Sequence, residues 1–364
     1  MNWKLVGEKK NVWNGALKGC IWPEGPHIYK ANGYYYIMHA EGGTGPEHSV
    51  MIARSKDIWG PYTGNPKNPI LTHRHLGNDY PIKYVGHGDI IQTPAGEWFM
   101  TMLAVRPINR FTTMGRETFL AKFIWEEDWP VVNPGVGMLT DTVDIDLEPW
   151  NPTEDITSYT YRTGNKTTIP GTDKDYIFGN ISMLGDEFLF LRNYPDDMFK
   201  LQDGGLLIKA GREDIKAVGS PSFVAIRQQH HHFTSTVRVE VGNLKNNETA
   251  GLVLLQNNLY NLRVEVRNGE AAMVLCQKGA DEIVGSASLT EVSSNNEVVL
   301  EIIVDGLTTK GVAGEKVLGE ASVSNLSTEV AGGFVGCCIG MYASANGVSS
   351  DTYVNFKEFT YKAN

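Results

Sequence analysis

The sequence contains few cysteines, no cluster of basic residues and no long apolar run. Its four cysteines, Cys20, Cys276, Cys337 and Cys338, are too few and too scattered for a disulfide framework. They also lack the Cys-x-x-Cys spacing that is typical of metal sites. We therefore expect them to be buried thiols.

The missing basic clusters and apolar runs exclude two classes of partner. The net charge is −10 and the sequence pI is about 5.4, so no large basic surface is available to neutralise phosphates, and we expect no nucleic-acid partner. No run of about 18 apolar residues occurs and the first ten residues lack the apolar core of a signal peptide, so we expect no membrane partner. The composition, 41% apolar and 20% charged, predicts a globular chain with room for two cores.

Aromatic residues, glycine and proline are abundant in residues 1–140 and predict short strands joined by tight turns. An internal echo supports this prediction. Residues 26–36 contain PHIY followed by GYYY, and residues 88–99 contain GDII followed by GEWF; strands at 50–53 and 118–125 follow the two copies. A β-sandwich could also supply short aromatic strands, but a repeat of this length favours four-stranded propeller blades.

A second pattern begins after residues 141–185, a proline-containing stretch of little periodicity that we interpret as an interdomain connection. Apolar and polar residues alternate at 236–241 and 262–266, which indicates half-buried antiparallel strands. Further strands at 298–304 and 354–359 complete a two-sheet jelly roll over residues 186–364.

Glu24 is the first candidate for chemistry. It lies between Pro23 and Pro26 with Gly25 beside it, so a bend and not a regular ladder presents its carboxylate. An apolar, aromatic strand follows directly, and such surroundings favour the protonated form that a general acid needs. From these residues alone, an ordinary turn carboxylate is the more common interpretation of the pattern.

The order and spacing of three motifs resemble glycoside hydrolase family 43, which contains β-xylosidases and α-L-arabinofuranosidases. The motifs are WPEGPHIYK at 22–30, GYYY at 33–36 and AEGGT at 40–44. The second half resembles the concanavalin-like sandwich that follows many propellers of this family. The resemblance implies an all-β fold, a five-bladed propeller followed by a jelly roll, and inverting, exo-acting hydrolysis of xylose- or arabinose-containing plant polysaccharide fragments.

The resemblance also implies roles for single residues. Glu24 would be the general acid, and Trp22 and Arg116, the latter in a Gly-Arg-Glu-Thr motif, would bind the substrate. His87, in a Gly-His motif, would help to hold a structural calcium ion through water near the propeller axis. Without the resemblance, His87 between two glycines would be interpreted as structural, because imidazole is a poor ligand for hard cations. Arg116, an arginine before a strand, would be interpreted as a surface residue. The run 230–232, three histidines, is interpreted as sandwich surface, since adjacent strand residues face opposite sides.

One departure from the family concerns the catalytic base. Family members begin with a strand that carries an aspartate base, and neither that segment nor the second aspartate segment matches here. Asp57, Asp79 and Asp89 lie in different surroundings. We therefore expect a partial propeller made of the C-terminal blades, with a second chain supplying the others. The alternative is a catalytically incomplete subunit that binds carbohydrate or stabilises a partner.

Overall fold

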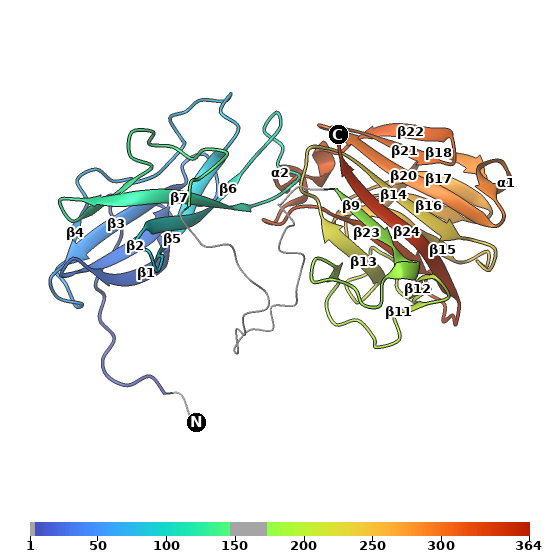
Figure 1. Ribbon diagram of the computed structural model, residues 1–364, viewed down its shortest axis with the longest axis horizontal. Coiled ribbons are helices and arrows are strands. Elements are labelled where there is room, and N and C mark those ends of the chain that lie inside the picture. The colour runs from blue at the N-terminus through green and yellow to red at the C-terminus, as the bar shows by residue number, and fades with distance from the viewer. Residues whose placement is uncertain (1–3, 146–172) are drawn as a thin grey trace. The chain divides into compact units, whose positions relative to one another are not determined.

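A computed structural model describes residues 4–145 and 173–364 of the chain (Figure 1). These residues form two compact units. Unit 1 contains residues 4–107 and 116–145, and unit 2 contains residues 108–115 and 173–364. Nearly all regular structure in both units is β-strand, so the predicted all-β class is confirmed.

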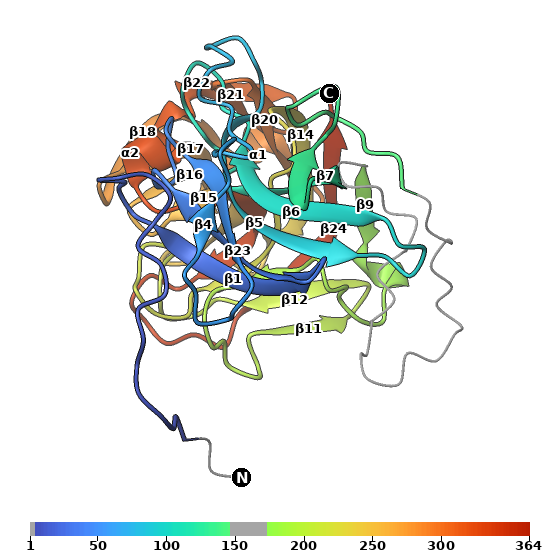
Figure 2. The same ribbon diagram turned by 90° about the vertical axis from the view of Figure 1, so that its left-hand side faces the viewer.

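Unit 1 consists of two four-stranded antiparallel sheets in which each strand pairs with the next in the chain. The first sheet contains β1 (Glu24–Ala31), β2 (Tyr34–Glu41), β3 (Ser49–Ser55) and β4 (Thr63–Gly64). The second contains β5 (Lys83–Gln92), β6 (Trp98–Val105), β7 (Glu117–Glu126) and β8 (Trp129–Val132), drawn in cyan to green in Figure 2. The echo at 26–36 and 88–99 thus corresponds to the first two strands of each sheet, and the predicted strands at 50–53 and 118–125 to the third.

A shared apolar core lies between these two sheets. Tyr36 and Met38 of β2 and Ile52 of β3 are fully buried, together with Met100 of β6 and Phe123 of β7. The opposite face of β2 buries His39 and Glu41, so this strand is covered on both sides. Burial of apolar side chains from both sheets is what makes the pair one folding unit.

Unit 2 is a sandwich of two antiparallel sheets. The seven-stranded sheet has the order β10 (Leu189–Phe190), β13 (Ser222–Arg227), β23 (Cys338–Ser344), β15 (Thr249–Asn257), β16 (Tyr260–Arg267), β17 (Glu270–Gln277) and β18 (Ala280–Ser288). The facing sheet has the order β11 (Phe199–Gln202), β12 (Gly205–Lys209), β24 (Tyr353–Ala363), β14 (His232–Glu240), β20 (Glu297–Asp305), β21 (Thr308–Ala313) and β22 (Lys316–Ser322). In addition, β9 (Lys174–Ile177) pairs with β24, and β19 (Ser293–Ser294) pairs with β20. The helices are single turns, at α1 (Leu289–Val292), α2 (Thr328–Ala331) and the 3-10 turns Phe178–Asn180 and Ser324–Leu326.

One prediction about this sandwich is wrong in detail. The alternation at 262–266 predicts a polar face exposed to solvent, yet Arg263 and Glu265 are only 3% and 2% exposed. Residues 211–219 lie over this face: Ile215 packs into its apolar part, and Lys216 Nζ is 3.0 Å from Asp281 Oδ2. A sheet face that looks solvated in the sequence is buried because a distant loop covers it.

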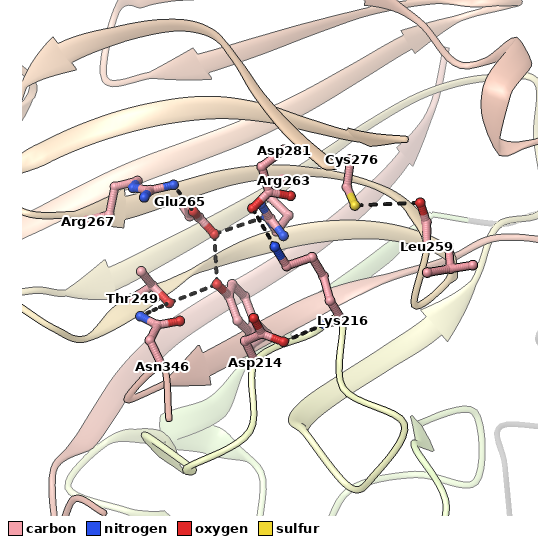
Figure 3. Close-up of polar contacts among 11 residues, drawn as sticks. Asp214, Lys216, Thr249, Leu259, Arg263, Glu265, Arg267, Cys276, Asp281 and Asn346 are labelled. Carbon is pink, nitrogen blue, oxygen red and sulfur yellow. Dashed lines mark hydrogen bonds and ion pairs between the residues drawn. The ribbon is translucent and has the colours of Figure 1, made fainter. Parts of the chain in front are cut away.

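The buried residues Arg263 and Glu265 belong to a network of ion pairs and hydrogen bonds (Figure 3). Arg263 contacts Glu265 at 3.3 Å and Asp281 at 2.8 Å, and Tyr342 donates its hydroxyl to Glu265 at 2.7 Å. Burial alone would lower the pKa of Arg263, but the charges of Glu265 and Asp281 raise it above its ordinary value. The guanidinium is therefore charged and paired between the seven-stranded sheet and the covering residues 211–219.

The unit boundaries differ from the domain limits drawn from composition. Residues 146–172 of the predicted connection lie outside the described residues, but β9 pairs with β24, and Tyr176 and Phe178 lie in the sandwich core. Residues 108–115, within the predicted propeller segment, pack on unit 2, where Thr112 N and Oγ1 donate to the Glu329 carboxylate at 2.7 and 2.8 Å. Neither contact has a local sequence signal, because both join residues far apart in the chain.

The remaining expectations concern the cysteines, the histidine run and helices. All four cysteines are free; Cys276 and Cys337 are buried as expected, whereas Cys20 and Cys338 are only partly buried. His230 and His232 contact different partners, Tyr361 and Asp305. Within residues 4–145 and 173–364, we find no helix with the length and apolar character needed to cross a membrane.

Candidate active site

Glu24 stands at the start of β1, where the strand is irregular. It pairs with Ala40, and the register then shifts before His27 pairs with Met38. Gly25 has a φ of +57°, which favours glycine, so the predicted bend is present as a bulge at the head of a strand. The Glu24 side chain is 50% exposed. A bulge that leaves a carboxylate accessible to solvent can present it to a substrate.

His87 lies beside this carboxylate. Its Nδ1 is 4.0 Å from Glu24 Oε1, and its ring lies against Gly25, where an added Cβ would come 2.4 Å from Nε2. His87 itself has a φ of +53°, and the register of β5 shifts on both sides of Gly86. Two bulged strands therefore bring the predicted acid and the predicted histidine together.

Arg116 belongs to the same group of charges. It is exposed and directly precedes β7, whose first residue Glu117 holds Arg106 through hydrogen bonds of 2.7 to 3.2 Å. The charges of Arg116, His87 and Glu24 all act on one imidazole, that of His48. Three residues from separate parts of the sequence thus converge on one region of unit 1.

Trp22 lies directly before β1 with 66% of its surface exposed. Its indole ring packs on Gly43, since an added Cβ on Gly43 would come 2.3 Å from Trp22 Cε3. This contact links the WPEGPHIYK and AEGGT motifs in space and explains why the second motif needs glycine. An exposed aromatic ring is a suitable surface for a sugar ring.

Sequence reasoning missed His48, which is only 1% exposed. Burial lowers its pKa, and the charges of His87 and Arg116 lower it further, against a hydrogen bond to the Tyr84 backbone and the charge of Glu24. The ring is therefore neutral at pH 7. The only available signal was a histidine just before a buried strand, which is too common to indicate a site.

The three aspartates considered as a base, Asp57, Asp79 and Asp89, have different surroundings. Asp89 accepts a hydrogen bond from the Tyr29 hydroxyl and lies 3.8 Å from His27 Nδ1. Asp57 accepts a bond from the Trp59 backbone at 2.8 Å, as in a turn, and Asp79 is exposed. Among the described residues, no hydrogen bond or ion pair joins Asp57 or Asp89 to Glu24.

The resemblance implies a calcium ion near His87. Within the described part of the chain, no group of three or more His, Cys, Asp or Glu side chains could hold a metal ion directly. A calcium ion near His87 would thus have to be bound through water, with the imidazole holding a water of its hydration shell, as the resemblance implies. The calcium site stays a prediction, and no chemical step below depends on it.

Comparisons with known proteins identify the family of both parts of the chain. Residues 2–130 match the model of glycosyl hydrolases family 43, and residues 178–362 match the β-xylosidase C-terminal concanavalin A-like domain. The predictions of a glycoside hydrolase family and of a concanavalin-like sandwich are thereby confirmed.

Three relatives show how far the similarity extends. A xylosidase/arabinosidase of Butyrivibrio fibrisolvens is 42% identical over 98% of this chain and 68% of its own length. A non-reducing end α-L-arabinofuranosidase of Bacteroides ovatus is 35% identical over 93% of this chain and 62% of its own. The structure of a xylan β-1,4-xylosidase from Bacillus halodurans superposes with a TM-score of 0.82 at 27% identity, over 98% of this chain and 68% of that one.

The chain thus spans about two thirds of the length of these relatives. Its matches run through both units, and the residues that converge at Glu24 lie inside the matched segment 2–130. From these matches and the whole-chain identity, the chain belongs to family 43 of the glycosyl hydrolases and carries the concanavalin A-like domain of its β-xylosidases.

Proposed function

We propose that this glycoside hydrolase chain acts on xylose- or arabinose-containing plant polysaccharide fragments, exo-acting and with inversion. The relatives named above are a xylosidase/arabinosidase, an arabinofuranosidase and a xylosidase. The observation that carries the proposal is the position of Glu24, an accessible carboxylate on a strand bulge, 4.0 Å from His87.

In the proposed reaction, Glu24 donates its proton to the oxygen of the leaving sugar. The half-exposed side chain lets the glycosidic oxygen approach, and the imidazole Nδ1 of His87 lies 4.0 Å from Glu24 Oε1. Arg116 donates hydrogen bonds from its guanidinium to sugar hydroxyls beside the cleaved bond, and Trp22 offers its exposed ring to the sugar face.

An inverting glycosidase also needs a carboxylate base about 6.5 to 9.5 Å from the acid, with a water between them. Asp57 and Asp89 are engaged by Trp59 and Tyr29, and a second chain that carries the family's aspartate segments is the proposed source of the base. The same observation supports the second candidate function, a catalytically incomplete subunit that binds carbohydrate.

Product stereochemistry tests the main proposal. The active assembly, which is this chain together with the polypeptide proposed to supply the base, would be incubated with an aryl β-xyloside and an aryl α-L-arabinofuranoside. Proton NMR would follow the anomeric signal of the released sugar. We expect the first-formed sugar to have the opposite anomeric configuration to the substrate. Retention of configuration would contradict the inverting mechanism, and binding without hydrolysis by every assembly would favour the incomplete subunit.

A further inference from the structure

Two contacts between a histidine and a glycine lie in series beneath the candidate site. The ring of His48 lies on Gly86, where an added Cβ would come 2.4 to 2.5 Å from three ring atoms. One residue further on, the ring of His87 lies on Gly25 in the same way, at 2.4 Å from Nε2. The first contact involves a residue that has no role in the proposed reaction.

The segment between these contacts has an unusual backbone. Tyr84 and His87 have φ values of +56° and +53°, and β5 changes register between Lys83 and Gly86 and again before Asp89. Non-glycine residues at positive φ cost free energy and persist where the surroundings hold them. His48 supplies one such restraint, because its Nδ1 lies 2.8 Å from the Tyr84 carbonyl oxygen.

His48 is itself held firmly. Its backbone nitrogen donates to Gly45 O at 3.1 Å, and its carbonyl oxygen accepts from Thr72 Oγ1 at 2.8 Å. Since Nδ1 faces a carbonyl oxygen, Nδ1 carries the proton of the neutral ring. The side chain is therefore a fixed donor at the base of β5.

We propose that His48 is a positioning residue for the general acid: it holds the bulge at Tyr84–Gly86, which places His87 against Gly25 and beside the Glu24 carboxylate. The inference rests on the proposed role of Glu24. His48 does not touch the substrate, because its side chain is buried. Its effect passes through the backbone of β5 to the His87 imidazole.

Replacing His48 tests this arrangement. His48→Leu keeps the bulk of the side chain but removes the donor, and His48→Asn keeps a donor at about the position of Nδ1. In the active assembly, we expect His48→Leu to lower kcat for a natural xyloside by about tenfold to a hundredfold, a part of the 10² to 10⁴ typical of general acid help. Hydrolysis of an aryl glycoside with a good leaving group should fall less than about threefold, KM should change little, and His48→Asn should recover most of the lost rate.

His73→Leu is the matched control. His73 is also buried, and its Nδ1 also contacts a backbone carbonyl, Ile82 O at 2.7 Å. Burial lowers the pKa of His73 as it lowers that of His48. This control variant should lose stability to a similar extent, and its rates of hydrolysis of the two substrates should fall by equal factors.

A crystal structure of the 364-residue His48→Leu chain supplies a readout that does not need activity. We expect His87 to leave Gly25 and the distance from its Nδ1 to Glu24 to increase. An unmoved His87, or equal losses on both substrates, would overturn the inference. If His48→Leu does not fold, comparison of His48→Asn with His48→Gln tests the inference, because the longer Gln side chain misplaces the donor. Similar leaving-group selectivity in these two variants would also overturn the inference. If Glu24→Gln itself shows no selectivity, the proposed function fails, and the position of His87 still decides the structural part.

Discussion

The imidazole of His87 and the backbone of Gly25 are in direct contact, at a distance that leaves no room for a Cβ on residue 25. Gly25 also has a φ of +57°, so this position needs glycine for its backbone and for its neighbour. The contact joins the bulge of β1 to the bulge of β5 and holds the His87 Nδ1 4.0 Å from Glu24 Oε1. The first prediction concerns that carboxylate.

Glu24→Gln should abolish hydrolysis of natural glycosides by the active assembly, because an amide cannot protonate the leaving oxygen. Activity on an aryl glycoside with a good leaving group should fall less, since that group needs little protonation. Steady-state kinetics on the two substrates measure the difference. Glu47→Gln, at an exposed surface carboxylate, is the control and should change neither rate. Small, equal losses for Glu24→Gln would remove this residue from the role.

Arg116→Ala should lower kcat/KM by about one to two orders of magnitude. Loss of a charge-assisted hydrogen bond to a sugar hydroxyl is worth about 1.5 to 3 kcal/mol. The control is Arg74→Ala, which removes a surface guanidinium 3.9 Å from Glu47. A ligand-bound structure in which Arg116 points away from the sugar would end this assignment.

The 364-residue chain alone should be a poor hydrolase. Without a base for the attacking water, the rate should be lower by at least about 10² to 10⁴. The assay measures the hydrolysis rate of aryl xylosides and arabinosides by the purified chain, before and after adding a polypeptide with the propeller blades that carry the family's two aspartate segments. A fold-matched polypeptide with both aspartates changed to asparagine is the control. Strong activity of the chain alone would show that it already contains a base.

The stability of unit 1 should decrease as the pH falls below about 6.5. His48 and His73 have pKa values lowered by burial, so the unfolded chain binds protons first as the pH falls. The two histidines contribute their full share to the free energy of unfolding above the pKa of an unfolded histidine, about 6.5. As the pH falls from there to their pKa in the folded state, this share is lost, by up to about 1.4 kcal/mol per pH unit for each ring.

Urea unfolding between pH 5.5 and 7.5, followed by tryptophan fluorescence, measures this slope, because every tryptophan in the described residues lies in unit 1. His73→Asn should make the slope shallower by the share of one histidine. An unchanged slope in that variant would contradict the prediction.

Arg263→Met should destabilise the sandwich by about 3 kcal/mol, because it removes one of the two cations that lie 3.3 Å from the buried Glu265 and also breaks the 2.8 Å pair with Asp281. Hydrogen exchange of β15, β16 and β17 reports this loss directly. Arg238→Met is the control: its ion pair with Glu358 is half exposed, so the change should be at most about 1 kcal/mol. Equal effects of the two variants would mean that the buried network contributes no more than a surface pair.

The sequence alone determined the strands and the position of the general-acid candidate. Alternation at 236–241 predicts β14, and the further strand predicted at 298–304 is β20. The echo at 26–36 and 88–99 predicts the two four-stranded sheets. The proline and glycine residues around Glu24 predict a bend, and a bulge is present there. These features are local, since backbone preferences and side-chain period act over a few residues.

Only the tertiary structure decided which distant residues meet. It placed His48 beneath Gly86 and buried Arg263 under residues 211–219, and it assigned residues 108–115 to the sandwich unit. Each of these contacts joins segments with no shared local pattern, and each depends on the packing of complete sheets. A short sequence window cannot contain that information, because the same histidine or arginine would be exposed if the covering segment lay elsewhere.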